Sequence, residues 1–215
     1  MSKPTVDYSL YVVTDRGLAR GRSVGEVVRR TLEGGAGVIQ YREKESCFRR
    51  MLAEAAPLAA MVHRKGAVFL INDRVDLALA VGADGVHLGR DDMPVEVARR
   101  LLGPGALIGA SVQNAMEARE AVTAGADYLG VSGVFATATK TDVGAVLGVG
   151  MVREIAAAVA PIPVVAIGGI NTGNAAAVIR AGAAGLAVVS AVVASDDIEG
   201  ACRDLLAEVA AGKKE

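Results

Sequence analysis

At 215 residues the chain is long for one ordinary domain but lies within the range of single α/β barrels. Its 52% hydrophobic content, 26 Gly and 3% aromatic residues indicate an interior of Ala, Val, Ile and Leu, as in parallel α/β folds. The formal net charge of −1 argues against nucleic acid or an anionic membrane as a partner, so any anion site must be local.

The chain contains eight strand-like segments that alternate with helical segments. The strands are predicted over Ser9–Thr14, Val38–Arg42, Val68–Asn72, Gly85–Leu88, Leu107–Ser111, Tyr128–Val131, Pro163–Gly168 and Gly185–Ser190. Helical periodicity or Ala-rich composition marks residues 23–34, 46–65, 74–81, 94–102, 114–124, 148–159, 172–181 and 196–211. This alternation predicts an α/β fold, a single (β/α)8 TIM barrel over residues 1–215 with its core at about 8–211. A doubly wound open sheet is the alternative.

A short Gly-Ala phrase recurs between a helical pattern and a strand. It stands at Gly34–Val38, Val81–Val86, Ala124–Tyr128 and Ala181–Leu186. A Gly just after a helix can adopt a positive φ, and the small Ala that follows lets the chain turn into a buried strand. The phrase therefore predicts a helix-to-strand joint at every second unit.

The second predicted strand runs into the charged stretch QYREK, residues 40–44. Val38, Gln40, Arg42 and Lys44 alternate along it and so share one face. If this face is the barrel axis, an amide and two cations line the carboxyl end of the strand, where such barrels carry catalytic groups. The alternative is a solvated charge run that opens the next helix.

Carboxylates follow the third and fourth predicted strands. Asn72 and Asp73 end the third, and Asp91 and Asp92 follow the fourth. Two carboxylates from neighbouring strands can share one Mg²⁺ that also binds substrate phosphates. The alternative is that Asp73 and Asp92 only cap the helices that follow them.

The loop after the sixth predicted strand carries Thr137, Thr139 and Lys140 among several glycines. Hydroxyls and an ammonium group on such a loop suit a lid that closes over phosphate, and a plain surface loop is the alternative.

Small residues end the last two strands. Gly168 and Gly169 follow the seventh, and Ser190 opens a helix after the eighth. The loops after strands seven and eight are the usual phosphate site of these barrels, because backbone N–H groups hold the anion there. Turn geometry alone can also explain the glycines.

The remaining reactive residue types exclude several chemistries. His87 lies among apolar neighbours and reads as a hydrogen-bonded core histidine. No Ser-His-Asp order, nucleophilic Cys setting or dinucleotide G-x-G-x-x-G is present. Cys47 and Cys202 are far apart and the longest apolar stretch is broken by Pro and Gly, which predicts a reduced, cytoplasmic protein without a membrane span.

The combined inventory is two anion sites, a carboxylate-held metal and several cations, without an obvious general base. Ester hydrolysis needs an activated water, whereas departure of pyrophosphate needs only charge neutralisation. The sequence therefore predicts transfer of an organic group between small-molecule substrates. A homo-oligomer is left open.

The chain resembles the thiamine-phosphate synthase family over nearly its whole length. The resemblance is carried by Leu10–Asp15, Gln40–Lys44, Ile71–Asp73, Gly85–Gly89, Thr137–Lys140, Ala166–Ile170 and Val189–Ser190. The chain departs from the usual pattern at Ser132-Gly133, Ala136, Gln113 and Arg90, which puts fine substrate contacts in doubt.

The resemblance implies which residues act. The pyrimidine diphosphate would be bound by Gln40, Tyr41, Arg42, Glu43, Lys44, Asn72, Ser111 and Lys140, and Mg²⁺ by Asp73 and Asp92. The thiazole phosphate would be held by Thr137, Thr139, Gly169, Val189 and Ser190. Arg42, Lys44, Ser111 and Lys140 would take part in catalysis, which in this family is dissociative, so that pyrophosphate leaves before the thiazole nitrogen attacks.

Three other functions are open alternatives. A thiazole tautomerase of a related barrel family needs no pyrophosphate clamp, whereas Arg42, Lys44, Asp73, Asp92 and Lys140 are all present here. A sugar-phosphate isomerase or aldolase needs an acid/base pair or a Schiff-base Lys inside the barrel, and none is evident. A non-enzymatic sensor of phosphate ligands would keep binding after Lys140 and Asp92 are mutated.

Overall fold

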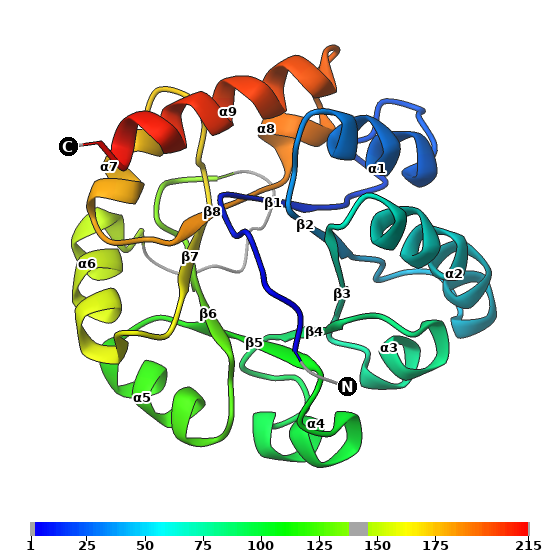
Figure 1. Ribbon diagram of the computed structural model, residues 1–215, viewed down its shortest axis with the longest axis horizontal. Helices are drawn as coiled ribbons and strands as arrows, with labels where there is room; N and C mark the ends of the chain where they lie inside the picture. The colour runs from blue at the N-terminus through cyan, green and yellow to red at the C-terminus, as the bar shows by residue number, and fades with distance from the viewer. Residues whose placement is uncertain (1–2, 138–145, 215) are drawn as a thin grey trace.

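In the computed structural model of the chain, parallel strands form a closed barrel that the helices surround (Figure 1). The structure describes residues 3–137 and 146–214. The strands of this part of the chain are β1 (Leu10–Val13), β2 (Val38–Tyr41), β3 (Val68–Asn72), β4 (Gly85–Leu88), β5 (Leu107–Val112), β6 (Tyr128–Ser132), β7 (Val164–Ile167) and β8 (Gly185–Val188). β1 pairs in parallel with both β2 and β8. The predicted (β/α)8 barrel is confirmed, and the open sheet is excluded.

The helices follow the strands in alternation. They are α1 (Val24–Glu33), α2 (Phe48–Arg64), α3 (Val75–Val81), α4 (Val95–Leu102), α5 (Ala115–Thr123), α6 (Gly148–Val159), α7 (Ala175–Arg180), α8 (Ser190–Val193) and α9 (Ile198–Gly212) within the described residues. Ser190 opens a helix as predicted, but this is the separate four-residue α8, which the predicted helix ranges omit. No helix of the described residues combines the length and the apolar character that a membrane crossing requires.

The recurring Gly-Ala phrase forms helix-to-strand joints, as predicted. Gly35, Gly82, Gly125 and Gly182 have φ angles of 96°, 65°, 103° and 100°. This left-handed region is open to Gly without steric cost, so the phrase ends each helix and starts the next strand.

Alternation along the strands separates two hydrophobic layers. Tyr11, Val38, Leu70 and Val165 belong to the cluster inside the barrel. Ile39 and its equivalents on the other strands belong to the larger cluster between the barrel and the helices. Because successive strand residues point to opposite faces, the even-numbered positions of β2 face the barrel interior.

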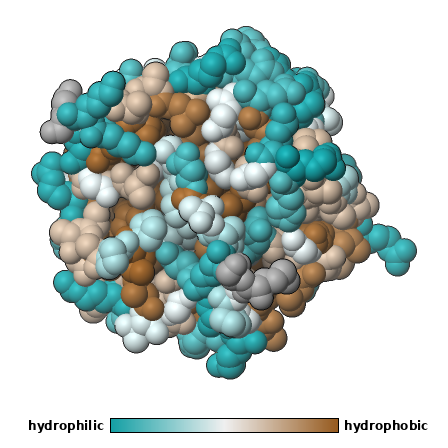
Figure 2. Space-filling view, in the orientation of Figure 1, coloured by the Kyte–Doolittle hydropathy of each residue, from teal (hydrophilic) through white to brown (hydrophobic). Residues whose placement is uncertain are grey.

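The residues before β1 cover the end of the barrel at which the strands begin. Val6 and Tyr8 pack against the inner cluster, and Lys3 forms an ion pair with Asp127. In Figure 1 this dark blue segment crosses in front of the strands. Figure 2 shows the same face, with hydrophilic residues around its margin. The opposite end, where the strands finish, carries the polar residues that the sequence predicts for the site, such as Arg42, Asp73 and Asp92.

Gly185, the first residue of β8, is packed against backbone. A Cβ atom there would lie 1.6 Å from the carbonyl oxygen of Tyr8 and 2.3 Å from its carbonyl carbon. The chain before β1 would have to move, so we expect Gly185→Ala to lower the free energy of unfolding by roughly 1–3 kcal/mol. Urea unfolding of wild type and variant measures this change.

Gly150 of α6 supplies the matched control, because a Cβ there would meet no heavy atom within 4 Å. We expect Gly150→Ala to raise the free energy of unfolding by about 0.5–1 kcal/mol, as Ala loses less conformational entropy in a helix. Equal destabilisation by both substitutions would contradict the packing described for Gly185.

Candidate active site

A cavity lies at the carboxyl ends of the strands. Its lining contains most of the predicted site residues, namely Gln40, Arg42, Lys44, Asn72, Asp73, Asp92, Ser111, Thr137, Gly169, Val189 and Ser190. Thr139 and Lys140, which are also predicted site residues, lie outside the described residues. Side chains from separate strand ends are thus brought together at one place, as the barrel topology requires.

Gln40, Arg42 and Lys44 of the QYREK stretch all line the cavity, although β2 itself ends at Tyr41. Gln40 is only 4% exposed. The Lys44 side chain is 52% exposed and its ammonium group contacts the carboxylate of Asp73. The stretch thus brings three side chains to the cavity, while Lys44 and Glu45 keep contact with solvent.

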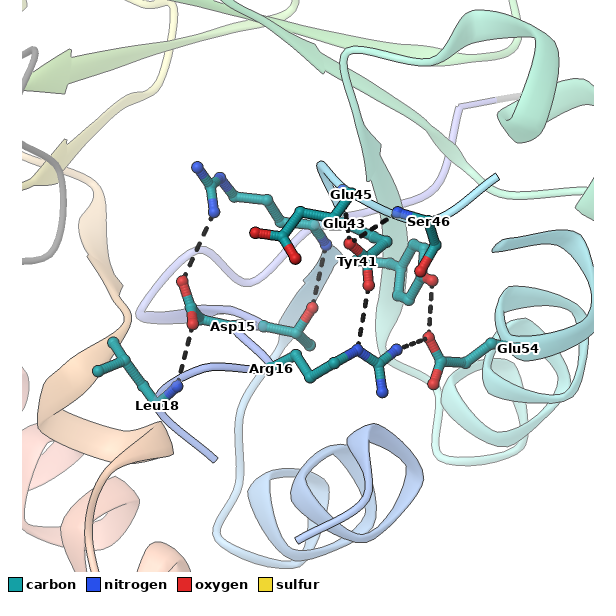
Figure 3. Close-up of polar contacts among 10 residues, drawn as sticks. Asp15, Arg16, Leu18, Tyr41, Glu43, Glu45, Ser46 and Glu54 are labelled. Carbon is teal, nitrogen blue, oxygen red and sulfur yellow. Dashed lines mark hydrogen bonds and ion pairs between the residues drawn. The ribbon is translucent and has the colours of Figure 1, made fainter. Parts of the chain in front are cut away.

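Tyr41 and Glu43, which are also predicted substrate contacts, are not among the residues that line the cavity. The Tyr41 hydroxyl donates to Glu54 Oε2 of α2 at 2.7 Å, and Glu43 Oε2 accepts from Arg16 Nε at 3.1 Å (Figure 3). Odd-numbered positions of β2 face the helices, so Tyr41 points away from the barrel axis. Both residues brace the turn that carries Arg42 and Lys44.

Glu43 holds this turn through backbone N–H groups. Its Oε1 accepts from Glu45 N at 2.9 Å and from Ser46 N at 3.3 Å. Burial alone would raise the pKa of Glu43, but these hydrogen bonds and the one from Arg16 outweigh it and lower the pKa to about 2.

Replacing Glu43 by Gln is expected to make stability less dependent on pH in the acid range. A carboxyl group whose pKa is lowered on folding stabilises the protein above its unfolded pKa of about 4.3, and this contribution is lost as the pH falls towards 2. We expect Glu43→Gln to cost about 1 kcal/mol at pH 7 and nothing near pH 2, as measured by denaturant unfolding at each pH.

Glu45→Gln is the matched control, because Glu45 is exposed and takes part in this turn through its backbone N–H. Its stability should follow that of wild type at every pH. If Glu43→Gln also followed wild type from pH 7 to pH 2, Glu43 would not be holding the turn.

Arg42 is positioned by β1 as well as by its own strand. Its backbone N–H donates to Thr14 Oγ1 at 3.0 Å, and its Nη1 lies 3.5 Å from Asp15 Oδ2. Asp15 lines the cavity and also accepts from Leu18 N at 3.1 Å, as Figure 3 shows. Sequence reasoning assigned no role to Asp15, although it follows a strand just as Asp73 does.

Asp73 occupies a strained turn at the end of β3. Its φ angle is 62°, and Arg74 N donates to Asn72 O at 2.7 Å, closing a three-residue γ-turn around it. The turn directs the Asp73 carboxylate towards Lys44 and towards Asn72, whose Nδ2 donates to Oδ2 at 2.6 Å. Such strain is typical of functional sites.

Asp92 faces the same region from the loop after β4. Its Oδ2 accepts from Gly89 N at 2.7 Å. Burial and the neighbouring carboxyl group of Asp73 raise the pKa of Asp92, while the Gly89 N–H opposes the rise. Two carboxyl groups that share a site in this way repel each other when both are ionised, and a divalent cation between them would relieve the repulsion.

Neither carboxylate caps a helix, so capping does not explain them. The N-cap residue of α3 is Arg74, and that of α4 is Pro94. In the described residues no group of three or more His, Cys, Asp or Glu side chains is arranged to hold a metal ion. A cation at Asp73 and Asp92 would therefore take its other ligands from water or substrate oxygens, as Mg²⁺ commonly does.

The floor of the cavity is formed by aromatic and imidazole side chains that sequence reasoning did not assign to the site. Tyr11, Tyr128 and His87 all line it. His87 is hydrogen-bonded through both ring nitrogens, as expected for a core histidine, but it also faces the cavity. The alternation of inward and outward residues along β1, β4 and β6 could have predicted that these three side chains face the barrel interior.

The other side of the cavity is built by the turns after β7 and β8. Gly168 and Gly169 have φ angles of 112° and 62°, and Gly168 O accepts from Phe135 N at 3.0 Å. A Cβ on Gly169 would lie 2.4 Å from the carbonyl oxygen of Ala136. The loop after β6 thus packs directly on the turn after β7, which brings Thr137 to the same cavity as Ser190.

The fold and this arrangement define a class of protein: a (β/α)8 barrel whose strand ends combine cations, paired carboxylates and a glycine turn in one cavity. Residues 10–192 match the family described as thiamine monophosphate synthase. The chain is 56% identical to the thiamine-phosphate synthase of Chloroflexus aurantiacus, covering 95% of this chain and 94% of that protein. It is 49% identical to the one from Methanoculleus marisnigri, covering 97% and 98%.

A solved structure gives the same result. The thiamine phosphate pyrophosphorylase from Pyrococcus furiosus superposes with a TM-score of 0.88 at 45% identity, covering 96% of this chain and 97% of that one. The chain belongs to the thiamine-phosphate synthase family.

Proposed function

We propose that the chain joins 4-amino-2-methyl-5-hydroxymethylpyrimidine diphosphate to 4-methyl-5-(2-hydroxyethyl)thiazole phosphate and releases thiamine phosphate and pyrophosphate. Membership of a transferase family of thiamine biosynthesis supports this reaction. The observation that carries it is that Arg42, Lys44 and the Asp73–Asp92 pair line one side of a cavity whose other side is the turn at Gly169 and Ser190. One side suits a diphosphate and the other suits a monophosphate.

The diphosphate would lie against the ends of β2, β3 and β4. Arg42 and Lys44 supply positive charge there, and Asn72 supplies an amide beside Asp73. Gln40 and Ser111, lower in the barrel, would contact the pyrimidine ring. Lys140, on the loop after β6, would add a further cation.

The monophosphate of the thiazole would lie against the ends of β7 and β8. Gly169, Val189 and Ser190 border this part of the cavity and bring backbone N–H groups close to it. Thr137, and Thr139 from the same loop, would add hydroxyl groups.

The bond between the pyrimidine methylene carbon and the diphosphate oxygen breaks first, and its electron pair leaves with pyrophosphate. The thiazole nitrogen then forms the new bond by donating its lone pair to the methylene cation. Arg42 and Lys44 favour the first step because they neutralise charge that grows on the leaving group. Water would also capture the cation, so exclusion of water by the loop after β6 belongs to the proposal; residues 138–145 of this loop lie outside the described residues.

Mg²⁺ is the cation that Asp73 and Asp92 would hold. The two carboxylates fit it because they are hard oxygen ligands from neighbouring strands and because their proximity raises the pKa of Asp92. When bound, Mg²⁺ supplies neutralisation of the departing pyrophosphate.

The proposed reaction is tested by incubating the protein with Mg²⁺ and both substrates and measuring pyrophosphate and thiamine phosphate. We expect the two products in equal amounts, and no thiamine phosphate when the thiazole phosphate is omitted. Isomerisation of a thiazole phosphate without pyrophosphate release would instead assign the tautomerase activity, and phosphate-ligand binding without either reaction would assign a sensor.

A further inference from the structure

Five side chains from five strands form one hydrogen-bonded chain across the cavity floor. The Gln40 amide Nε2 donates to the Tyr11 hydroxyl. The Tyr11 and Tyr128 hydroxyl oxygens lie 3.0 Å apart. The Tyr128 hydroxyl lies 2.9 Å from His87 Nδ1, and His87 Nε2 lies 3.0 Å from Ser111 Oγ.

We propose that Tyr11, Tyr128 and His87 are positioning residues that impose one direction on this chain, so that Gln40 offers an acceptor and Ser111 a donor to the substrate ring. The proposal rests on the proposed function, because it concerns the ring-binding part of the same site. It gives Tyr11, Tyr128 and His87 a role in orienting Gln40 and Ser111 and no part in the chemical step.

The direction follows from the first member of the chain. An amide NH₂ group can only donate, so the Tyr11 oxygen accepts from Gln40. Tyr11 then has one proton, and the Tyr128 oxygen is the acceptor beside it. Tyr128 in turn directs its own proton at His87 Nδ1, which must be unprotonated to accept it.

The reverse direction leaves a buried proton without an acceptor. If His87 Nδ1 donated to Tyr128 and Tyr128 donated to Tyr11, the Tyr11 oxygen would accept twice. Tyr11 is 2% exposed and Tyr128 is fully buried, and in the described residues Tyr11 Oη has no third partner. Because an unsatisfied buried donor is costly, the forward direction is favoured.

Two consequences reach the cavity. In this direction His87 Nε2 is the donor, so Ser111 Oγ accepts from it and turns its own proton towards a ligand. Gln40 lines the cavity. No described residue donates a hydrogen bond to its Oε1, and this oxygen is not among the buried side-chain atoms that lack a partner, so it remains an acceptor for a ligand in the cavity. An acceptor and a donor at separate points suit a ring that carries an amino group and a bare ring nitrogen, as an aminopyrimidine does.

Two glycines make room for this chain, which indicates that the fold is built around it. A Cβ on Gly109 would lie 2.1 Å from the Tyr128 ring carbon Cζ, and a Cβ on Gly130 would lie 2.8 Å from His87 Cε1. Any side chain at these positions would displace Tyr128 or His87.

The test reads the His87 tautomer by ¹⁵N NMR of the imidazole nitrogens at neutral pH. The polypeptide has only two His residues, so the spectrum of the His63→Gln variant shows which signals belong to His87. We expect His87 in wild type to carry its proton on Nε2 and to accept at Nδ1. In Tyr128→Phe the donor to Nδ1 is lost, and we expect the Nδ1-protonated tautomer to become populated.

Kinetics provide the second readout. We expect Tyr11→Phe and Tyr128→Phe to lower kcat/KM for the pyrimidine diphosphate on the order of tenfold, the effect of one lost hydrogen bond, with the KM for thiazole phosphate unchanged. Tyr8→Phe is the matched control: the Tyr8 ring centroid lies 5.1 Å from that of Tyr128, but its hydroxyl is not a member of the chain. It should stay within twofold of wild type.

A His87 that carries a proton on Nδ1 in wild type would overturn the proposal. So would a Tyr128→Phe variant whose tautomer and kinetics match those of Tyr8→Phe. If wild type makes no thiamine phosphate, the proposed function fails, but the tautomer measurement still decides whether the chain has the assigned direction.

Discussion

Replacing Asp92 by Asn is expected to lower the rate of pyrophosphate release on the order of 10²- to 10³-fold, with a higher Mg²⁺ concentration needed for half-maximal rate. By analogy with removal of one transition-state donor, loss of one carboxylate weakens charge neutralisation at the leaving group. Asn keeps the size of Asp and can still accept from Gly89 N. The measurement is a Mg²⁺ titration of initial rate at saturating substrates.

The fold of this variant should be intact. Burial and the Asp73 carboxyl group raise the pKa of Asp92, so a neutral Asn removes an unfavourable charge, and we expect a melting temperature equal to or above that of wild type. Asp91→Asn is the matched control, because Asp91 is the adjacent carboxylate, is exposed and does not line the cavity. Wild-type rate and Mg²⁺ dependence in Asp92→Asn would contradict the role assigned to Asp92.

Arg42→Ala is expected to lower kcat/KM for the pyrimidine diphosphate by about 10²- to 10³-fold, with little change in the KM for thiazole phosphate. The guanidinium group lines the side of the cavity proposed to bind the diphosphate, while the side proposed for the monophosphate is made by the turns after β7 and β8. Arg42→Lys should recover part of the loss, because Lys keeps the charge but not the two-pronged donor geometry. Initial rates with each substrate varied in turn separate these effects.

Arg29→Ala controls for the change in net charge, since Arg29 is half exposed on α1 and pairs with Glu33. It should leave both KM values unchanged. A similar rise in both KM values for Arg42→Ala would show that Arg42 supports the cavity as a whole and does not act on the diphosphate.

The convergence of the site could be predicted from the sequence because it follows from two simple rules. Alternation along the strand at Val38 and Gln40 predicts the inward face of β2, and the barrel topology brings the ends of all strands to one rim. The same alternation places Tyr41 on the helix side of β2. The family motif assigns the whole stretch to substrate, whereas Tyr41 bonds to Glu54 of α2 and Glu43 bonds to Arg16.

Other features depend on contacts between distant segments and had no local signal. Tyr11 and Tyr128 are 117 positions apart and meet only because the barrel closes. The γ-turn at Asp73 is set by its neighbours in the fold, including Asp73 N donating to His87 O at 2.9 Å. A capping role for Asp73 was an open alternative in the sequence, and the position of α3 removes it.

The most direct test of the account is a crystal structure of the protein with Mg²⁺, pyrophosphate and thiamine phosphate bound. We predict pyrophosphate beside Arg42 and Lys44, Mg²⁺ held by Asp73 and Asp92, and the monophosphate of the product at Gly169 and Ser190. Pyrophosphate at the ends of β7 and β8, or Mg²⁺ away from both carboxylates, would contradict the account.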